Sequence, residues 1–143
     1  MESNDCINFI LSNTQNAVYN YFKRRLQDYD TTPSQYELLR CLWKHDGLTP
    51  SQLAQAMHLD TSSITGILGR LEKKNLISRV YSQEDRRSVS IYLREEGKQL
   101  WSQIDHVIDE ANAKIISGFN EKDYSQFLSY LTMIENNTAE DPS

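Results

Sequence analysis

Small and hydroxyl-bearing residues gather between Thr61 and Arg70, in a stretch that also carries a helical apolar repeat. Apolar residues at three- and four-residue steps, from Ile64 to Leu71, predict an amphipathic helix that buries one side. The other side holds residues that helix propensity alone does not favour: Thr61, Ser62, Ser63, Thr65, Gly66 and Gly69, followed by Arg70. A helix with a slim face and hydrogen-bond donors can enter the major groove of duplex DNA. The simpler alternative is that residues 61–63 only cap the helix.

A second group of charged side chains lies between two segments in which apolar and polar residues alternate. Val89, Ile91 and Leu93 alternate with polar residues, which predicts a strand, and residues 77–81 can form its antiparallel partner. The connecting tip carries two acidic and two basic residues in a row, from Glu84 to Arg87. Arginines on a thin ribbon can enter the narrow, negative minor groove, and Asp85 can hold one guanidinium by a bidentate pair. The alternative is an ordinary solvated turn.

Charge is distributed unevenly along the chain. The net charge is −5, which by itself argues against a nucleic-acid partner. Residues 61–94, however, contain seven basic and three acidic residues, so this window carries +4 and the remainder carries −9. A basic block in an acidic body is a localised electrostatic footprint for a polyanion, although a solvated charged face is an equally simple interpretation.

The elements that position these residues follow from capping and periodicity. Residues 7–29 predict one amphipathic helix, and the tetrapeptide Thr-Pro-Ser-Gln begins two more, at Thr32 and at Thr49. A long helix begins near Glu95, and Asn120 caps a last one. The predicted fold is mainly α with a small two-stranded β wing, a winged helix-turn-helix. We expect residues 31–94 to form this DNA-binding domain, and residues 1–30 and 95–143 to form a helical dimerisation region.

The wing segment and its neighbours make the family recognisable. The segment from Glu84 to Leu93, followed by Glu96-Gly97, resembles the multiple-antibiotic-resistance regulator (MarR) family, as do residues 32–39, 53–65 and 71–79. The resemblance covers about residues 7–134. Two positions depart from the family pattern: Arg94 stands where a capping Thr is usual, and Asn75 replaces a Gly, which the left-handed conformation tolerates.

The resemblance implies a bacterial homodimer that represses transcription by binding palindromic duplex DNA. The DNA-binding residues it and the pattern predict are Ser51, Gln52, Thr61, Ser62, Ser63, Thr65, Gly66, Arg70, Asp85, Arg86, Arg87 and Ser88. It also implies a small aromatic or lipophilic effector, and Tyr19, Tyr36 and Trp43 are the candidate pocket residues. No bound cofactor is expected. A winged helix used only for protein–protein contact is the main alternative.

Other chemistries have weaker support in the sequence. The sequence contains no phosphate-binding glycine loop and no nucleophile motif, so we do not expect an enzyme. His106 and Glu110 lie one helical turn apart and can share a metal, and Cys6 lies near the region where some relatives sense peroxides, so a metal- or redox-responsive regulator is a further alternative. No 18-residue apolar span occurs, and the polar N-terminus is unlike a secretion signal, so we expect a cytoplasmic protein without membrane contact.

Overall fold

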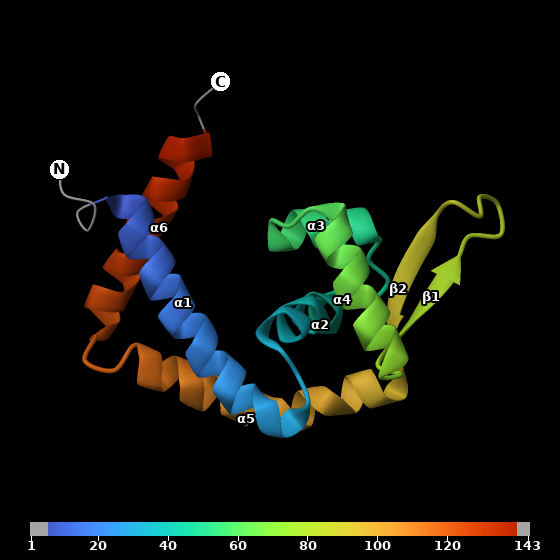
Figure 1. Ribbon diagram of the computed structural model, residues 1–143, viewed down its shortest axis with the longest axis horizontal. Coiled ribbons are helices and arrows are strands. Elements are labelled where there is room, and N and C mark those ends of the chain that lie inside the picture. Colours follow the sequence, from blue (N-terminus) through green and yellow to red (C-terminus); the bar gives the residue numbers. More distant parts are fainter. Residues whose placement is uncertain (1–5, 140–143) are drawn as a thin grey trace. The chain divides into compact units, whose positions relative to one another are not determined.

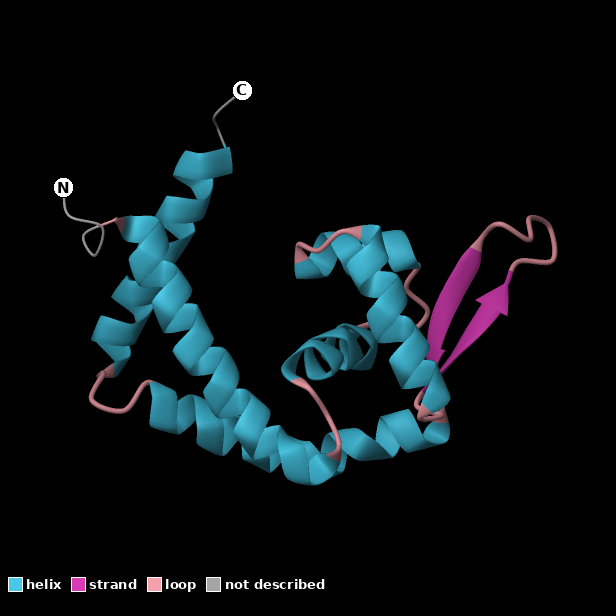
Figure 2. Ribbon diagram, in the orientation of Figure 1, coloured by secondary structure: helices cyan, strands magenta, loops and turns pink. Residues whose placement is uncertain are grey.

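The structure is a computed structural model that describes residues 6–139 of the 143-residue chain. The polar N-terminus that argued against a secretion signal, residues 1–5, lies outside the described residues. The elements are α1 (Ile7–Leu26), a 3-10 turn η2 (Gln27–Tyr29), α2 (Pro33–Lys44), α3 (Pro50–Met57), α4 (Thr61–Lys73), β1 (Ile77–Tyr81), β2 (Val89–Leu93), α5 (Glu95–Ile115) and α6 (Glu121–Ala139) (Figure 1). This order confirms the predicted mainly α fold with a two-stranded wing (Figure 2).

The chain divides into two compact units, one ending at Asp109 and one beginning at Glu110. The first unit contains the winged helix-turn-helix, in which α2, α3 and α4 pack against one another and against the wing. Its core is built from aliphatic side chains that are almost completely buried, because each helix turns its apolar stripe inward. They include Leu38, Leu39, Leu42, Leu53, Ile64, Leu68, Leu71, Ile77 and Ile91.

The two Thr-Pro-Ser-Gln tetrapeptides begin helices by the same mechanism, as the sequence predicts. Thr32 and Thr49 each accept a hydrogen bond from the backbone N–H of the glutamine three residues later, and each glutamine side chain accepts from the threonine N–H. These reciprocal bonds satisfy backbone donors that the first helical turn leaves unpaired. They fix where α2 and α3 begin.

The wing is an antiparallel pair with Ile77 opposite Leu93 and Tyr81 opposite Val89. Leu48, in the loop between α2 and α3, forms an isolated antiparallel β-bridge with Ile91. This bridge attaches the β2 edge of the wing to the helical core. Asn75 adopts the left-handed conformation expected for it, with φ of 62°. The ribbon then projects beside α4 (Figure 1).

One boundary differs in detail from expectation, the end of the first helix, whereas α5 begins at Glu95 as expected. The first helix ends at Leu26 and continues as the tighter turn η2, because Asp30 adopts φ of 50° and ends the helical path. At Arg94, which replaces the usual capping Thr, the backbone N–H donates to the Leu76 carbonyl at 2.9 Å. A Cβ placed on Gly97 would lie 2.2 Å from that same carbonyl oxygen, so the first turn of α5 needs glycine there.

The second unit contains the last turns of α5 and the whole of α6. Asn120 caps α6 as predicted, since its Oδ1 accepts the Asp123 N–H at 2.7 Å. Phe119 and Phe127 meet edge to face with ring centroids 5.8 Å apart. Many large apolar side chains of α6 stay exposed all the same, including Phe127, Leu128, Tyr130 and Met133.

Candidate nucleic-acid interface

The outward side of α4 carries the small and hydroxyl-bearing residues that the sequence singles out. Ile64, Ile67, Leu68 and Leu71 are buried, so the helix is oriented by its core face. Thr61, Ser62, Ser63, Thr65, Gly66 and Arg70 are all exposed, and Gly69 is half-buried. Lys73, which sequence reasoning left out, is also exposed and lies two turns after Gly66 on the same side.

Asp60 is the residue that caps α4. Its Oδ1 accepts the backbone N–H of Ser63 at 2.7 Å and the hydroxyl of Ser62 at 2.8 Å. These hydrogen bonds, led by the Ser63 N–H, lower the pKa of the Asp60 carboxyl from its ordinary value. The capping role therefore belongs to Asp60, and the hydroxyls of residues 61–63 are not needed to begin the helix.

Two hydroxyl protons on this helix are already used within it. Ser62 donates to Asp60, and Thr65 donates to the Thr61 carbonyl at 2.8 Å, the back-bond typical of threonine in a helix. What these two side chains offer outward is therefore an acceptor, together with the Thr65 methyl. In the major groove such groups suit the amino donors of cytosine and adenine and the thymine methyl better than they suit phosphate oxygens, which are acceptors.

The glycines of α4 have no packing reason in the described part of the chain. A Cβ placed on Gly66 or Gly69 meets no neighbour within 4 Å beyond the local helix backbone. Glycine within a helix costs about 0.5–1 kcal/mol relative to alanine. Packing within the protein therefore does not account for glycine at either position.

The wing tip is ordered by short-range hydrogen bonds. Ser82 donates its N–H to the Ser88 carbonyl at 2.9 Å, and Ser88 donates to the Asp85 carbonyl at the same distance. Asp85 Oδ1 accepts both the backbone N–H of Arg87, at 3.0 Å, and its Nε–H, at 3.3 Å. The expected bidentate pair is wrong in this respect, since a single carboxylate oxygen binds Arg87. Arg86 lies beside a surface hollow with Tyr81, Ser82 and Gln83.

Two links hold the end of α4 against its surroundings. Arg79 of β1 donates from Nε to Glu72 at 3.2 Å. Lys74 donates to the side-chain oxygen of Gln35 at 2.8 Å and to the Asp30 carbonyl. Gln35 is buried in α2, so Lys74 ties the end of α4 to the beginning of α2. The wing and α4 are thus fixed relative to the same core.

Ser51 and Gln52, the predicted contacts from α3, occupy different environments. Both are exposed at the beginning of the helix. The Gln52 side chain takes part in the capping box with Thr49, so its carbonyl oxygen is already bonded to the Thr49 N–H at 2.9 Å. Ser51 takes no part in the capping box, and it is exposed to solvent.

The three aromatic residues predicted for an effector pocket divide between two cavities. Trp43 lines a cavity of about 660 Å³ together with Arg40, Leu42, Lys44, Asp46, Leu93, Lys98 and Trp101. Tyr19 and Tyr36 line a smaller one of about 160 Å³ between α1 and α2. The two are neighbours, because the Tyr36 and Trp43 rings have centroids 6.1 Å apart. Burial raises the pKa of the Tyr36 hydroxyl from its ordinary value.

The larger cavity combines aromatic faces with cationic groups. The rings of Trp43 and Trp101 lie 5.0 Å apart at a tilt of 58°, and Trp43 Nε1 donates to the Gly97 carbonyl at 2.9 Å. Arg40, Lys44 and Lys98 supply positive charge, and Asp46 supplies one carboxylate. Sequence reasoning missed the cations and Asp46, because α2 and α5 are brought together only by the tertiary fold.

Residues 6–139 contain no cluster of three or more histidine, cysteine or acidic side chains placed to bind a metal ion. Within the same range, no helix has the length and apolarity to span a bilayer.

The comparisons with known proteins agree with this geometry. Residues 31–89 match the sequence model of the MarR family. The organic hydroperoxide resistance transcriptional regulator of Bacillus subtilis (strain 168) is 36% identical over 92 residues, which are 64% of this chain and 63% of the relative, so less than two-thirds of its length is matched.

Two solved structures cover nearly the whole chain. CouR from Rhodococcus jostii RHA1, bound to p-coumaroyl-CoA, is 26% identical with a TM-score of 0.79 and matches 92% of each chain. MepR of S. aureus, solved as a DNA complex, has a TM-score of 0.86 at 24% identity and matches 92% of this chain and 98% of its own. At that identity the second likeness establishes the fold alone.

Proposed function

We propose that the chain, which matches the sequence model of the MarR family over residues 31–89, is a transcriptional regulator of that family, binds a palindromic operator in duplex DNA as a homodimer and represses transcription. In this proposal the chain is a regulator and not an enzyme. Its place of action is the bacterial cytoplasm, where the operator lies. The observation that carries the proposal is the exposed hydroxyl and glycine face of α4 beside an arginine-bearing wing.

In this proposal α4 enters the major groove and the wing reaches the adjacent minor groove. The α4 contacts are Thr61, Ser62, Ser63, Thr65, Gly66 and Arg70, with Ser51 and Gln52 of α3 beside the backbone. Arg86 and Arg87 supply the minor-groove charge, while Asp85 and Ser88 shape the tip. The basic window of residues 61–94 favours this face for DNA over the acidic remainder of the chain.

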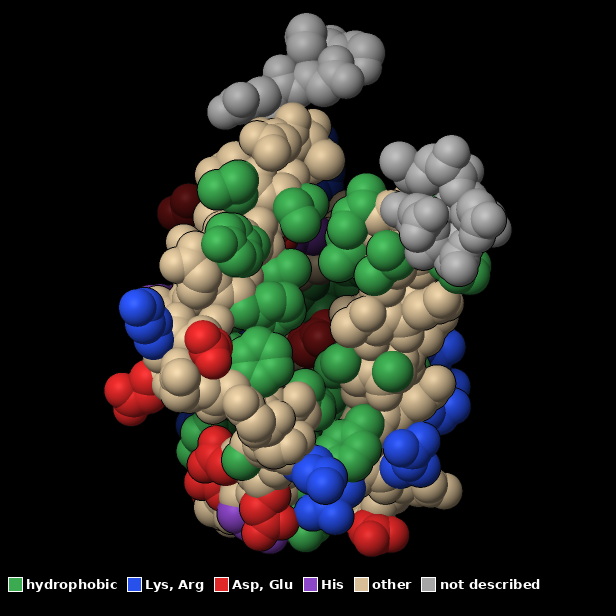
Figure 3. All heavy atoms as spheres, turned by 90° about the vertical axis from the view of Figure 1, so that its left-hand side faces the viewer, with side chains coloured by type: hydrophobic (Ala, Val, Ile, Leu, Met, Phe, Trp, Pro, Cys, Tyr) green, Lys and Arg blue, Asp and Glu red, His purple; other side chains and the backbone are tan. Residues whose placement is uncertain are grey.

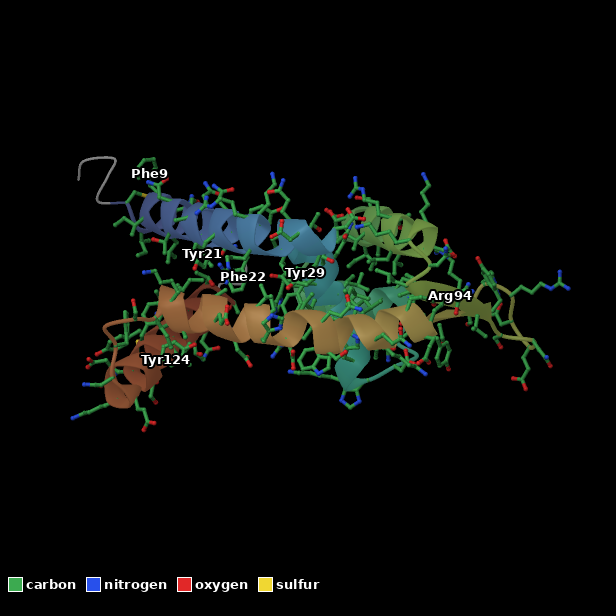
Figure 4. All side chains as sticks on the ribbon, turned by 90° about the horizontal axis from the view of Figure 1, so that it is seen from below. Phe9, Tyr21, Phe22, Tyr29, Arg94 and Tyr124 are labelled. Atoms are coloured by element: carbon green, nitrogen blue, oxygen red, sulfur yellow. The ribbon has the colours of Figure 1, made fainter. Side chains whose placement is uncertain are left out.

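The proposed dimer forms through the terminal helices. The beginning of α1 exposes three large apolar side chains, Ile7, Phe9 and Ile10, whose exposed fractions are 57, 49 and 44%. Figure 4 shows Phe9 on the opposite side of α1 from Tyr21 and Phe22. In α6, Phe127, Leu128, Tyr130 and Met133 are also exposed, and hydrophobic side chains are visible at the surface in Figure 3. Apolar surface on this scale is typical of an interface between subunits.

The proposed effector is a small aromatic or lipophilic molecule that carries an anionic group. The Trp43 and Trp101 rings offer stacking surfaces, and Arg40, Lys44 and Lys98 offer charge for a carboxylate or phosphate. The p-coumaroyl-CoA bound by CouR combines the same two properties. No resident cofactor is needed for this response.

A redox response is the second candidate. Cys6 is exposed and stands at the N-cap of α1, and one relative is an organic hydroperoxide resistance regulator. Treatment with an organic hydroperoxide distinguishes the two: release of DNA that is abolished by Cys6→Ser favours redox control, and release by aromatic acids alone favours the cavity.

The experiment that tests the proposed function is selection of duplexes from a random-sequence pool by the intact protein. We expect a palindrome whose half-sites are about 10 bp apart, one helical turn, because a twofold dimer presents two recognition helices at that spacing. If the folded protein enriches no sequence from the pool, sequence-specific DNA binding is refuted.

A further inference from the structure

Asp46, in the loop between α2 and α3, holds the base of the wing. Its Oδ1 accepts the backbone N–H of Leu93, the last residue of β2, at 2.8 Å. The two residues are 47 positions apart in the chain. The same oxygen accepts the Gly47 N–H at 3.2 Å, so one carboxylate oxygen joins the loop to the strand.

The neighbouring residues reinforce this junction. Gly47 donates its N–H to the Ile91 carbonyl at 2.9 Å, and Ile91 donates to the Leu48 carbonyl at 2.8 Å. Gly47 has φ of 83°, and a Cβ there would lie 2.9 Å from the Tyr92 ring, so the loop is pressed against β2. Arg94 follows directly at the base of the wing (Figure 4).

The base of the wing controls the position of its tip. Arg87 lies in the turn at the tip, six residues before Leu93, and the four steps of β2 alone extend about 13 Å. A small rotation at the base therefore moves the arginine tip further than it moves the base itself. Because Asp46 and Leu93 also line the tryptophan cavity, the same hydrogen bond lies between that cavity and the wing.

We propose that Asp46 is a positioning residue for DNA binding, which aims the wing through Leu93 and connects it to the tryptophan-lined cavity. This rests on the proposed DNA-binding function and adds a residue outside the DNA contacts. Asp46 carries a negative charge, which repels DNA. Its contribution is therefore the acceptor oxygen and the orientation that this oxygen imposes on β2.

A matched pair of variants isolates the acceptor. Asp46→Asn and Asp46→Ala both remove the negative charge, and only the asparagine keeps an oxygen in place. With a duplex selected by the wild-type protein, we expect Asp46→Ala to bind about fivefold more weakly than Asp46→Asn, the effect of one net hydrogen bond. In NMR exchange measurements, the Leu93 amide should exchange faster in Asp46→Ala and stay protected in Asp46→Asn.

A double-mutant cycle separates positioning from general damage. Arg87→Ala should reduce DNA affinity less in the Asp46→Ala background than in the Asp46→Asn background. The reason is that Arg87 contributes less to DNA binding when the wing is displaced. Equal losses in both backgrounds, equal affinities of the two Asp46 variants, or a protected Leu93 amide in Asp46→Ala would overturn the proposal. If the wild type selects no duplex, the proposed function itself fails instead.

The connection to the cavity has an intrinsic probe. The chain has two tryptophans, Trp43 and Trp101, and both line the cavity. Coupling between two sites is reciprocal, so DNA binding should change tryptophan emission in the wild type and in Asp46→Asn, and change it less in Asp46→Ala. Emission that does not respond to saturating DNA in the wild type, or that responds equally in all three proteins, would refute the connection.

Discussion

At the tip of the wing, a single carboxylate oxygen of Asp85 accepts two hydrogen bonds from Arg87. Oδ1 of Asp85 accepts the Arg87 backbone N–H at 3.0 Å and its Nε–H at 3.3 Å, while the Arg87 side chain is 93% exposed. An exposed pair of this kind contributes little to stability. Its effect is to orient a guanidinium that remains in solvent, which is the arrangement a charged ligand such as DNA requires.

Arg87→Ala should weaken binding to the selected duplex about tenfold and reduce the slope of log K against log salt by about 1, because one cationic contact is lost. The midpoint of denaturant unfolding should stay nearly unchanged, since the side chain is exposed. Lys122→Ala, which removes the same charge from α6, is the control and should alter neither the affinity nor the slope. Loss of affinity with the slope intact would contradict a wing–phosphate contact.

Gly66→Ala should have opposite effects on folding and on DNA binding. The new methyl group meets open space within the protein, so the free energy of unfolding should rise by about 0.5–1 kcal/mol. The same methyl should hinder close approach of the helix to the groove and lower DNA affinity. Thermal unfolding and fluorescence anisotropy measure the two effects. A variant that is both more stable and binds DNA unchanged would show that the slim face has no role in binding.

Stability at acid pH should depend on Asp60. Hydrogen bonds from Ser63 and Ser62 lower its pKa in the folded state, so its contribution is fully present above the unfolded-state pKa, near 4. That contribution is lost as the pH falls through the lowered folded-state pKa. Unfolding midpoints measured between about pH 5 and pH 2 should therefore decline less steeply in Asp60→Asn than in the wild type. Equal slopes would mean that the cap does not depend on the charge.

The two cysteines should react at different rates with a thiol reagent at neutral pH. Burial raises the pKa of the Cys41 thiol, so it remains protonated and is also partly shielded. Cys6 is exposed and should account for the fast phase, which Cys6→Ser should remove. A fast phase that persists in Cys6→Ser would identify Cys41 as the reactive thiol and would exclude Cys6 as the principal redox group.

The sequence was sufficient for the elements and their order. The repeated Thr-Pro-Ser-Gln signal, the Asn75 turn and the alternation of Val89, Ile91 and Leu93 act locally, so each can be recognised without the fold. The family resemblance then predicted which surface would bind DNA. The α4 face follows from helical spacing alone, as does Lys73, which the same spacing places on the side of Gly66, two turns further along the helix.

The sequence was not sufficient for relationships between distant residues. Asp46 and Leu93 are 47 positions apart, and Trp43 and Gly97 are 54 apart, and neither pair has a local signal. The split of Tyr19 and Tyr36 from Trp43 into separate cavities likewise depends on how α1, α2 and α5 pack. The single-oxygen contact at Asp85 depends on the turn geometry, which residue types do not determine.

We propose that α4 and the wing bind duplex DNA through the basic window of residues 61–94. The most direct test of this proposal is the salt dependence of binding between the intact protein and its selected duplex, from about 50 to 200 mM salt. We expect log K to fall steeply and linearly with log salt, and this slope to become shallower in Arg87→Ala but not in Lys122→Ala. Affinity independent of salt, or a slope that Arg87→Ala leaves unchanged, would contradict it.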